Sequence, residues 1–137
     1  MRNKLLVVIS ACLLLLTSSC VASNEVKVRL GEEFSLKSGQ IAVISDENLK
    51  IEFVEVTEDS RCPKGVTCIW EGQVVAKVLV RAGDTVDELL LTERGLTGER
   101  VHIYYQGYRL SYHVEPYPQE GETISKDQYR LLIVVSK

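Results

Sequence analysis

The stretch RVHIYYQGYRLSYHV, residues 100–114, has the pattern that decides the fold. Apolar and polar side chains alternate along its second half, as expected for a β-strand with one buried face. Gln106 and Gly107 interrupt the pattern and are typical of a turn between two antiparallel strands. We therefore predict a β-hairpin in this stretch. The side chains predicted to face inward are Tyr105, Tyr108, Leu110, Tyr112 and Val114.

Strand signals recur through the rest of the chain, separated by turn residues such as Gly31, Gly39 and Gly83. Helix signals are few, and about nine short strands at this spacing are typical of a sandwich or barrel. We predict an all-β fold, a single-domain antiparallel β-sandwich or closed barrel, over residues 25–137. The expected strands are residues 25–30, 34–36, 40–45, 49–56, 73–81, 85–92, 100–105, 108–114 and 129–135.

Two places in this pattern are less regular. Within residues 49–56 the apolar side chains change from odd to even positions after Phe53, which predicts a β-bulge. Gly83 and Asp84 predict a tight hairpin turn before the strand at residues 85–92. Asp84 could instead cap a short helix, so both interpretations of that segment stay open.

The N-terminus has the three parts of a secretory signal peptide, which we place at residues 1–19. Arg2 and Lys4 form a basic start, an apolar run covers residues 5–16, and small residues follow before Cys20. As a helix the apolar run would span roughly 18 Å, well short of the ~30 Å hydrocarbon core of a bilayer. The run therefore favours a cleaved signal over a transmembrane helix.

The order of apolar run, small residues and Cys20 resembles the lipobox of bacterial lipoproteins. In that family the signal is cut before the cysteine, which carries the lipid and becomes the new N-terminus. The resemblance implies a lipid on Cys20, a short tether over residues 20–24, and a cell-envelope location facing the periplasm or the exterior. Thr17 departs from the pattern, which usually has leucine there. Ordinary cleavage near Ala22, giving a secreted soluble protein, is the alternative.

The charge distribution argues against some partners. The whole chain has 16 basic and 19 acidic residues, and loss of Arg2 and Lys4 with the signal makes the remainder more acidic. Because no basic stripe is present, we expect neither nucleic acid nor an anionic lipid surface as a partner. Contact with the membrane is expected through the N-terminal lipid instead.

The most distinctive motif is DSRCPKGVTCIWEG, residues 59–72. It resembles a recurrent segment of small, mostly uncharacterised bacterial secreted proteins and lipoproteins, roughly D-S-R-C-P-x-x-V-x-C-x-W-x-G. The resemblance implies a family and a location but no activity. Glu71 departs from the pattern, which commonly has a small residue such as alanine there.

Cys62 and Cys68 are the two cysteines expected to remain in the mature domain, and an even pair in an exported chain predicts a disulfide. Pro63 and Gly65 would allow the six-residue spacing to close as a loop. Trp70 is expected to pack against the disulfide. A redox role is disfavoured because that chemistry uses the shorter Cys-x-x-Cys spacing.

The sequence favours neither a metal site nor catalysis. Cys62, Cys68, His102 and His113 have the right chemistry for a zinc or copper site, but both histidines fall on polar strand faces and oxidation would remove the thiolates. No catalytic motif is present, and a carboxylate pair such as Asp59 with Glu71 is expected by chance among 19 acidic residues. We predict no cofactor, no metal and no catalytic residues.

The remaining candidates form a binding surface. Tyrosine combines a flat apolar ring with a polar tip, and Tyr104 and Tyr117 are expected to be exposed. Arg61 and Lys64 belong to the cysteine loop, with Lys64 at its tip. The favoured function is a non-catalytic binding or structural module for an envelope protein or glycan. Inhibition of a host or phage enzyme through the Cys62–Cys68 loop is the alternative, and a hydrolase is a weaker third.

Overall fold

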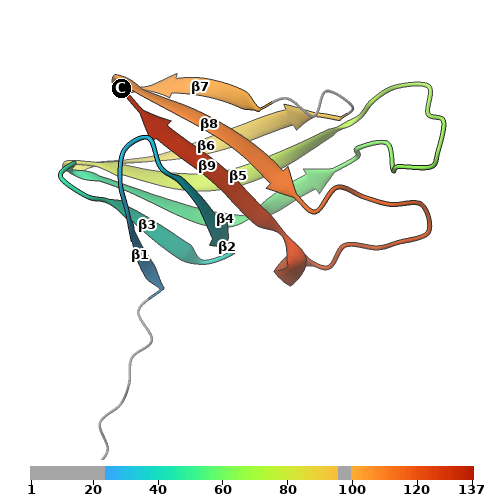
Figure 1. Cartoon of the computed structure of the whole chain (residues 1–137), viewed down its shortest axis with the longest axis horizontal. Coiled ribbons are helices and arrows are strands. Elements are labelled where there is room, and N and C mark those ends of the chain that lie inside the picture. The colour runs from blue at the N-terminus through green and yellow to red at the C-terminus, as the bar shows by residue number, and fades with distance from the viewer. Residues whose placement is uncertain (1–23, 96–99) are drawn as a thin grey trace, which may run out of the picture.

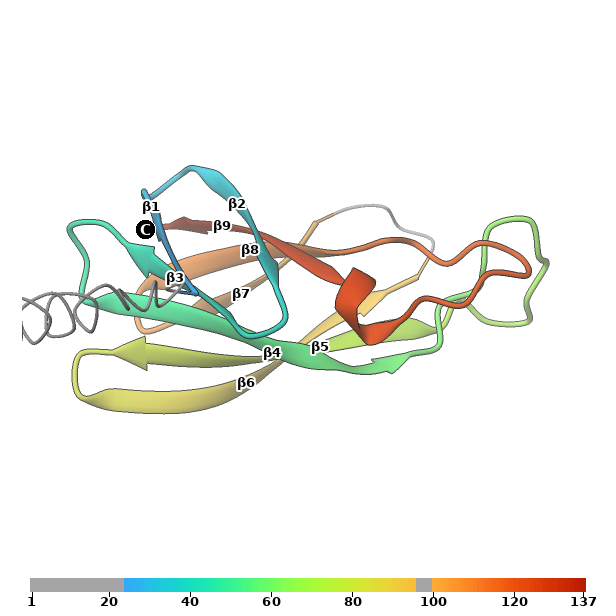
Figure 2. The same ribbon diagram turned by 90° about the horizontal axis from the view of Figure 1, so that it is seen from below.

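The structure is a computed structural model that describes residues 24–95 and 100–137. The described part of the chain folds into two β-sheets that stack as layers, which confirms the sandwich and not the closed barrel (Figures 1 and 2). The predicted signal at residues 1–19 and Cys20 lie outside the described residues. The strands are β1 Glu25–Val28, β2 Glu33–Lys37, β3 Gln40–Ile44, β4 Leu49–Asp59, β5 Gln73–Ala82, β6 Thr85–Arg94, β7 Val101–Tyr105, β8 Tyr108–Glu115 and β9 Arg130–Ser136.

One sheet has the strand order β1-β3-β4-β5-β6 and the other has β2-β9-β8-β7. Strand neighbours are antiparallel, with the exception of β1 and β3, which pair in parallel. The predicted antiparallel sandwich is therefore confirmed, with one parallel pair at this edge. The reason is that β2 crosses to the second sheet, so two changes of direction separate β1 from β3.

The core lies between the sheets and follows the alternation predicted from the sequence. Along β8 and β9 every second side chain is buried, including the inward-facing Tyr112 of the 100–114 hairpin. Tyr105 and Tyr108 are half-buried and pack against the edge of this core. The largest fully buried side chains include Phe53, Leu36, Ile44, Leu49, Ile51, Leu91, Leu110, Leu131 and Ile133.

The two irregular places are resolved by the structure. The register of β4 against β5 shifts between Phe53 and Glu55 and again between Val56 and Glu58, which confirms the bulge. The segment after Gly83 is the strand β6, which pairs with β5 along its whole length, so the hairpin is confirmed over the helix. Gly83 has a φ of 59°, a conformation that glycine adopts without strain.

The two ends of the sandwich differ. At one end, the loop after β4 and the loop after β8 extend together beyond the sheets and form the right-hand extremity of Figure 2. Lys64 in the first loop pairs with Gln119 in the second as an isolated parallel bridge. The chain enters β1 in the opposite half of the molecule (Figures 1 and 2). We call the extremity with these two loops the disulfide end.

Candidate functional site

The Cys62–Cys68 disulfide is present and closes the loop after β4, with an S–S distance of 2.07 Å and Cα atoms 6.0 Å apart. Within the loop, the Val66 amide donates to the Pro63 carbonyl, and Gly65 has a φ of 93° that favours glycine. The predicted bridge is therefore confirmed. Such a bond is typical of a chain exported to an oxidising compartment.

Arg61 is buried, with 3% of its surface exposed, so its predicted place on a binding surface is wrong. Its guanidinium donates through Nε and Nη2 to both oxygens of Asp59, at 2.9 and 2.6 Å. It also donates through Nη1 to the Val114 carbonyl and through Nη2 to the Pro116 carbonyl, each at 2.9 Å. These bonds connect the start of the cysteine loop to the end of β8, and they satisfy a charge that burial would otherwise penalise heavily.

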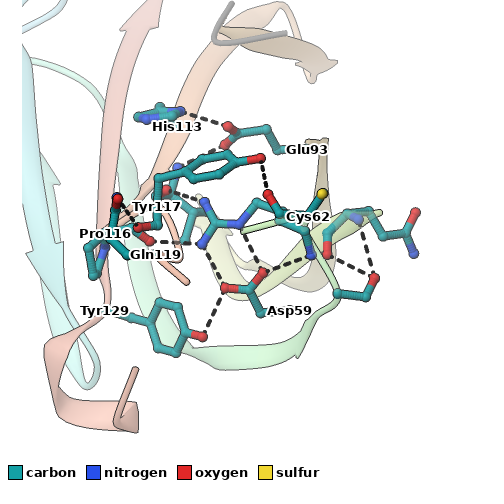
Figure 3. A network of polar contacts seen from close by, with 12 residues as sticks. Asp59, Cys62, Glu93, His113, Pro116, Tyr117, Gln119 and Tyr129 are labelled. Carbon is teal, nitrogen blue, oxygen red and sulfur yellow. Dashed lines mark hydrogen bonds and ion pairs between the residues drawn. The ribbon is translucent and has the colours of Figure 1, made fainter. Parts of the chain in front are cut away.

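Two tyrosines complete this buried network (Figure 3). The Tyr129 hydroxyl donates to Asp59 Oδ2 at 3.0 Å, and the Tyr117 hydroxyl donates to the Cys62 carbonyl at 2.9 Å. The Tyr117 ring also lies 5.0 Å from the Arg61 guanidinium carbon, a cation–π arrangement. Burial, followed by the hydrogen bond to Asp59, raises the pKa of Tyr129 to about 12.

A second buried group was missed by the sequence reasoning. Glu93 on β6 is 2% exposed, and its carboxylate accepts from the Val114 amide at 2.8 Å and lies 2.7 Å from His113 Nδ1. The alternation of side chains along β6 could have indicated that Glu93 is buried, because Leu89, Leu91 and Glu93 share the inward face. His113 is thus tied to a structural carboxylate beside the Arg61 network (Figure 3).

Of the remaining surface candidates, the structure brings Lys64 and Tyr117 together and leaves Tyr104 apart. Lys64 is exposed, and its Nζ lies 5.5 Å from the centre of the Tyr117 ring, which is half-buried. The Lys64 backbone is held by bonds to Pro118 and Glu120, each 3.0 Å long. Tyr104 is 74% exposed but lies on β7 near the opposite end of the sandwich (Figure 1).

A groove runs beside the disulfide loop on the Tyr117 side. Its volume is about 440 Å³, and its wall combines apolar side chains with the polar groups of Lys64, His113 and Tyr117. The groove therefore offers a mixed surface next to the loop rather than a closed cavity. Its lining residues are Cys62, Pro63, Lys64, Gly65, Val66, His113 and Tyr117.

The loop between β4 and β5 has exposed apolar side chains, and we call Ile69 and Trp70, which directly follow Cys68, its apolar tip. Ile69 is 107% exposed and Trp70 is 76% exposed, and Val66 on the same loop is 43% exposed. The expected packing of Trp70 against the disulfide is therefore wrong. Large apolar side chains gathered on a projecting loop are typical of a contact surface, because folding gains nothing from placing them there.

A second hollow, with a volume of about 360 Å³, lies between Trp70 and the neighbouring ends of β4, β5 and β6. Gly72 forms part of its floor with a φ of 68°, and a Cβ there would overlap the carbonyl oxygen of Ser60. Only glycine fits this position, which explains the glycine after Trp70 and Glu71 in structural terms. The lining residues are Glu58, Ser60, Trp70, Glu71, Gly72, Gln73 and Arg94.

Within residues 24–95 and 100–137, no three His, Cys, Asp or Glu side chains gather as a metal ion would require. No helix in this described part of the chain is long and apolar enough to cross a bilayer. No protein-family model, no curated protein and no solved structure matches this chain.

Proposed function

We propose that this chain is a lipid-anchored envelope protein that binds another envelope component, without catalysis, through its disulfide end. The resemblance of the N-terminal segment to lipoprotein signals supports an anchor at Cys20. The disulfide supports an exported location. The resemblance of residues 59–72 to a segment of bacterial secreted proteins and lipoproteins points the same way.

The observation that carries the binding role is the exposed apolar tip on a rigidly supported loop. Ile69 and Trp70 directly follow Cys68, which is joined by the disulfide to Cys62. The Cys62 carbonyl in turn accepts a hydrogen bond from the Tyr117 hydroxyl. A loop that is already ordered loses little conformational entropy when it binds. Exposed tryptophan held in this way is typical of the residues that dominate binding free energy at interfaces.

The orientation of the domain supports the same role. The short tether at residues 20–24 would join the membrane to β1, which lies in the half of the sandwich away from the loop (Figure 2). An anchored domain of this kind presents its disulfide end away from the membrane to which it is attached. Several acyl chains on one cysteine would make that attachment firm, since each buried CH₂ contributes about 0.8 kcal/mol.

The binding role is tested by sedimentation with envelope fragments. The full-length gene product, purified from membranes in mild detergent, is mixed with detergent-washed envelope fragments from cells that lack the gene. A tip variant, Ile69→Ser with Trp70→Ser, is compared with a control, Val86→Ser with Leu90→Ser. The control also replaces two exposed apolar side chains, but on β6. We expect the wild type and the control to sediment and the tip variant to stay in solution, and equal sedimentation of all three would refute the proposal.

The anchor is tested separately by metabolic labelling with palmitate. The wild-type chain should incorporate the label and remain with membranes, whereas Cys20→Ser should do neither, because the acylated thiol is missing. Label on the variant, or an unlabelled wild type that retains Met1, would overturn the lipoprotein assignment.

Inhibition of a host or phage enzyme is a second candidate, favoured by the same projecting loop. A disulfide-closed loop with an exposed tip has the convex shape that enters an enzyme cleft, and Lys64 would lie at its side. An inhibitor would find its target outside the cell and would leave the envelope fragments unbound. Sedimentation that depends on the loop tip therefore decides against this candidate.

A further inference from the structure

We propose that the hollow beside Trp70 binds a neutral carbohydrate chain, such as one built from N-acetylated or unmodified hexoses. This inference rests on the proposed binding role of the disulfide end and names the class of its ligand. It starts from residues 59–72, in which Asp59, Arg61, Cys62 and Gly72 each have a structural partner. Trp70 is the large side chain of this segment that lines a hollow while remaining 76% exposed.

Trp70 provides the apolar part of such a site. An indole is flat and apolar over most of its area and carries one N–H donor at its edge. The C–H face of a pyranose ring is also flat and apolar, so the two surfaces can stack while the sugar hydroxyls remain at the periphery. Stacking of this kind removes apolar area of Trp70 from water, which is favourable.

Other residues that line the hollow provide polar groups that are already hydrogen-bonded to one another. Ser60 Oγ donates to Glu58 Oε1 at 3.1 Å, and Gln73 Nε2 donates to the same oxygen at 3.2 Å. The backbone N–H of Gln73 in turn donates to Ser60 Oγ at 3.2 Å. Among the described residues, Glu58 Oε2 and Gln73 Oε1 make no hydrogen bond, so both are free to accept one from a ligand. Groups held in advance cost little entropy on binding.

The backbone beside the hollow is closely packed. A Cβ on Gly95 would overlap the Glu71 carbonyl oxygen, just as one on Gly72 would overlap that of Ser60. The Gly95 amide donates to the Gly72 carbonyl at 3.0 Å, which joins the two glycines. Close backbone packing therefore fixes Gly72 and Arg94, which line the hollow, relative to each other.

The charges around the hollow favour a neutral ligand. Glu58 and Glu71 line it together with Arg94. The two carboxylates disfavour an acidic polysaccharide or a phosphate, and the guanidinium disfavours a lysine-rich peptide. A neutral sugar meets neither penalty, and its neighbouring hydroxyls match carboxylate, amide and guanidinium groups, which offer two or more hydrogen-bonding atoms each.

The chain offers a direct readout, since Trp70 is its one tryptophan. The full-length gene product in mild detergent is titrated with N-acetylglucosamine tetraose and with maltotetraose, and tryptophan emission is recorded. Galacturonic acid tetraose and tetralysine are the anionic and cationic comparisons. We expect a saturable blue shift with a neutral tetraose and none with the charged probes.

The site is then assigned by measuring, with calorimetry, the affinity of variants for the neutral tetraose that binds the wild type. Trp70→Ala and Gln73→Ala should each weaken binding by about tenfold or more, while Val86→Ser, an exposed position on β6 that does not line the hollow, should bind as the wild type does. Circular dichroism confirms that each variant is folded. A tetraose bound equally by Trp70→Ala and the wild type would overturn the assignment, as would a preference for tetralysine.

The sedimentation assay separates this inference from the binding role on which it rests. Envelope fragments treated with protease should still retain the wild type if the ligand is carbohydrate. If the tip variant fails to sediment but neither neutral tetraose binds, the carbohydrate assignment fails and the binding role stands. If the tip variant sediments as the wild type does, the binding role itself fails.

Discussion

The two sides of one disulfide differ in a way that reverses the usual placement of side chains. On the Cys62 side the charged Arg61 is 3% exposed, whereas on the Cys68 side the apolar Ile69 and Trp70 are 107% and 76% exposed. The buried charge is paired with Asp59 and with two carbonyl groups. The exposed apolar side chains have no comparable support. The difference indicates that the first side of the loop builds the fold and the second side is free to contact a ligand.

The largest expected effect of a substitution is on the buried side, at Arg61. Arg61→Leu should lower the free energy of unfolding by roughly 3–5 kcal/mol, because the carboxylate of Asp59 would be left buried without its partner. Urea unfolding measures the change. Arg94→Leu is the control, since Arg94 is exposed, and should change the free energy little.

The same comparison can be sharpened by removing both charges. If Arg61→Leu destabilises the fold because it breaks the ion pair, the double variant Arg61→Leu with Asp59→Asn should be more stable than Arg61→Leu alone. In the double variant no uncompensated charge remains. A double variant that is less stable than the single one would show that Arg61 acts through its other contacts.

Removal of the disulfide that joins the two sides should lower the free energy of unfolding by a smaller amount. Cys62→Ser with Cys68→Ser should cost about 2 kcal/mol in the chain-entropy model, because the closed loop is short. Thermal unfolding under matched conditions measures this loss. In the wild type, denatured without reductant, neither cysteine should react with an alkylating reagent, and ready reaction of both would contradict the disulfide.

Tyr129 tests the buried side through pH. Its pKa in the folded chain, about 12, lies above the ordinary value of 10.0, so the unfolded chain loses this proton first. The stability that the raised pKa contributes is therefore complete below pH ~10 and is lost as the pH rises from ~10 to ~12, by up to about 2 kcal/mol. Burial also raises the pKa values of Tyr105 and Tyr112, so the wild type has further alkaline dependence.

Tyr129→Phe isolates the contribution of this one hydroxyl. The variant should be less stable than the wild type at pH 7, by about 1 kcal/mol for the lost hydrogen bond to Asp59. The difference between the two proteins should then shrink as the pH rises above ~10 and reverse its sign before pH ~12, because only the wild type loses the contribution of the raised pKa. A difference that stays constant up to pH ~12 would contradict the raised pKa.

The smallest effect is expected on the exposed side. Ile69→Ser should change the free energy of unfolding by no more than about 0.5 kcal/mol, because the side chain is fully exposed and touches no core residue. A loss comparable with that of Arg61→Leu would show that the loop tip has a structural role and would remove the contrast between the two sides.

Much of the fold could be predicted from local patterns. The 100–114 hairpin, the bulge after Phe53 and the turn at Gly83 all follow from alternation and turn residues, which depend on neighbours in sequence. The Cys62–Cys68 bridge could also be predicted, because its partners are six residues apart. Other pairings could not, and the parallel contact of β1 with β3 depends on the crossing of β2 to the other sheet.

The candidate site was predicted less completely. Lys64 and Tyr104 are exposed as predicted, but Arg61 was expected at the surface and is buried, and Trp70 was expected to be packed and is exposed. The closeness of Lys64 to Tyr117 was not predicted. Residue type misled here, since arginine is usually exposed and tryptophan usually packs inside. No sequence motif indicated the hollow beside Trp70, because its lining residues come from three separate segments of the chain.

The sequence by itself determined the strand pattern, the turns and the short disulfide loop, because each depends on residues close together along the chain. Only the tertiary structure decided which of two unlike side chains would be buried. Val114 and Pro116, more than 50 residues from Arg61, supply the carbonyl groups that satisfy its charge. No such partner reaches Trp70 in the described part of the chain, so the indole remains at the surface.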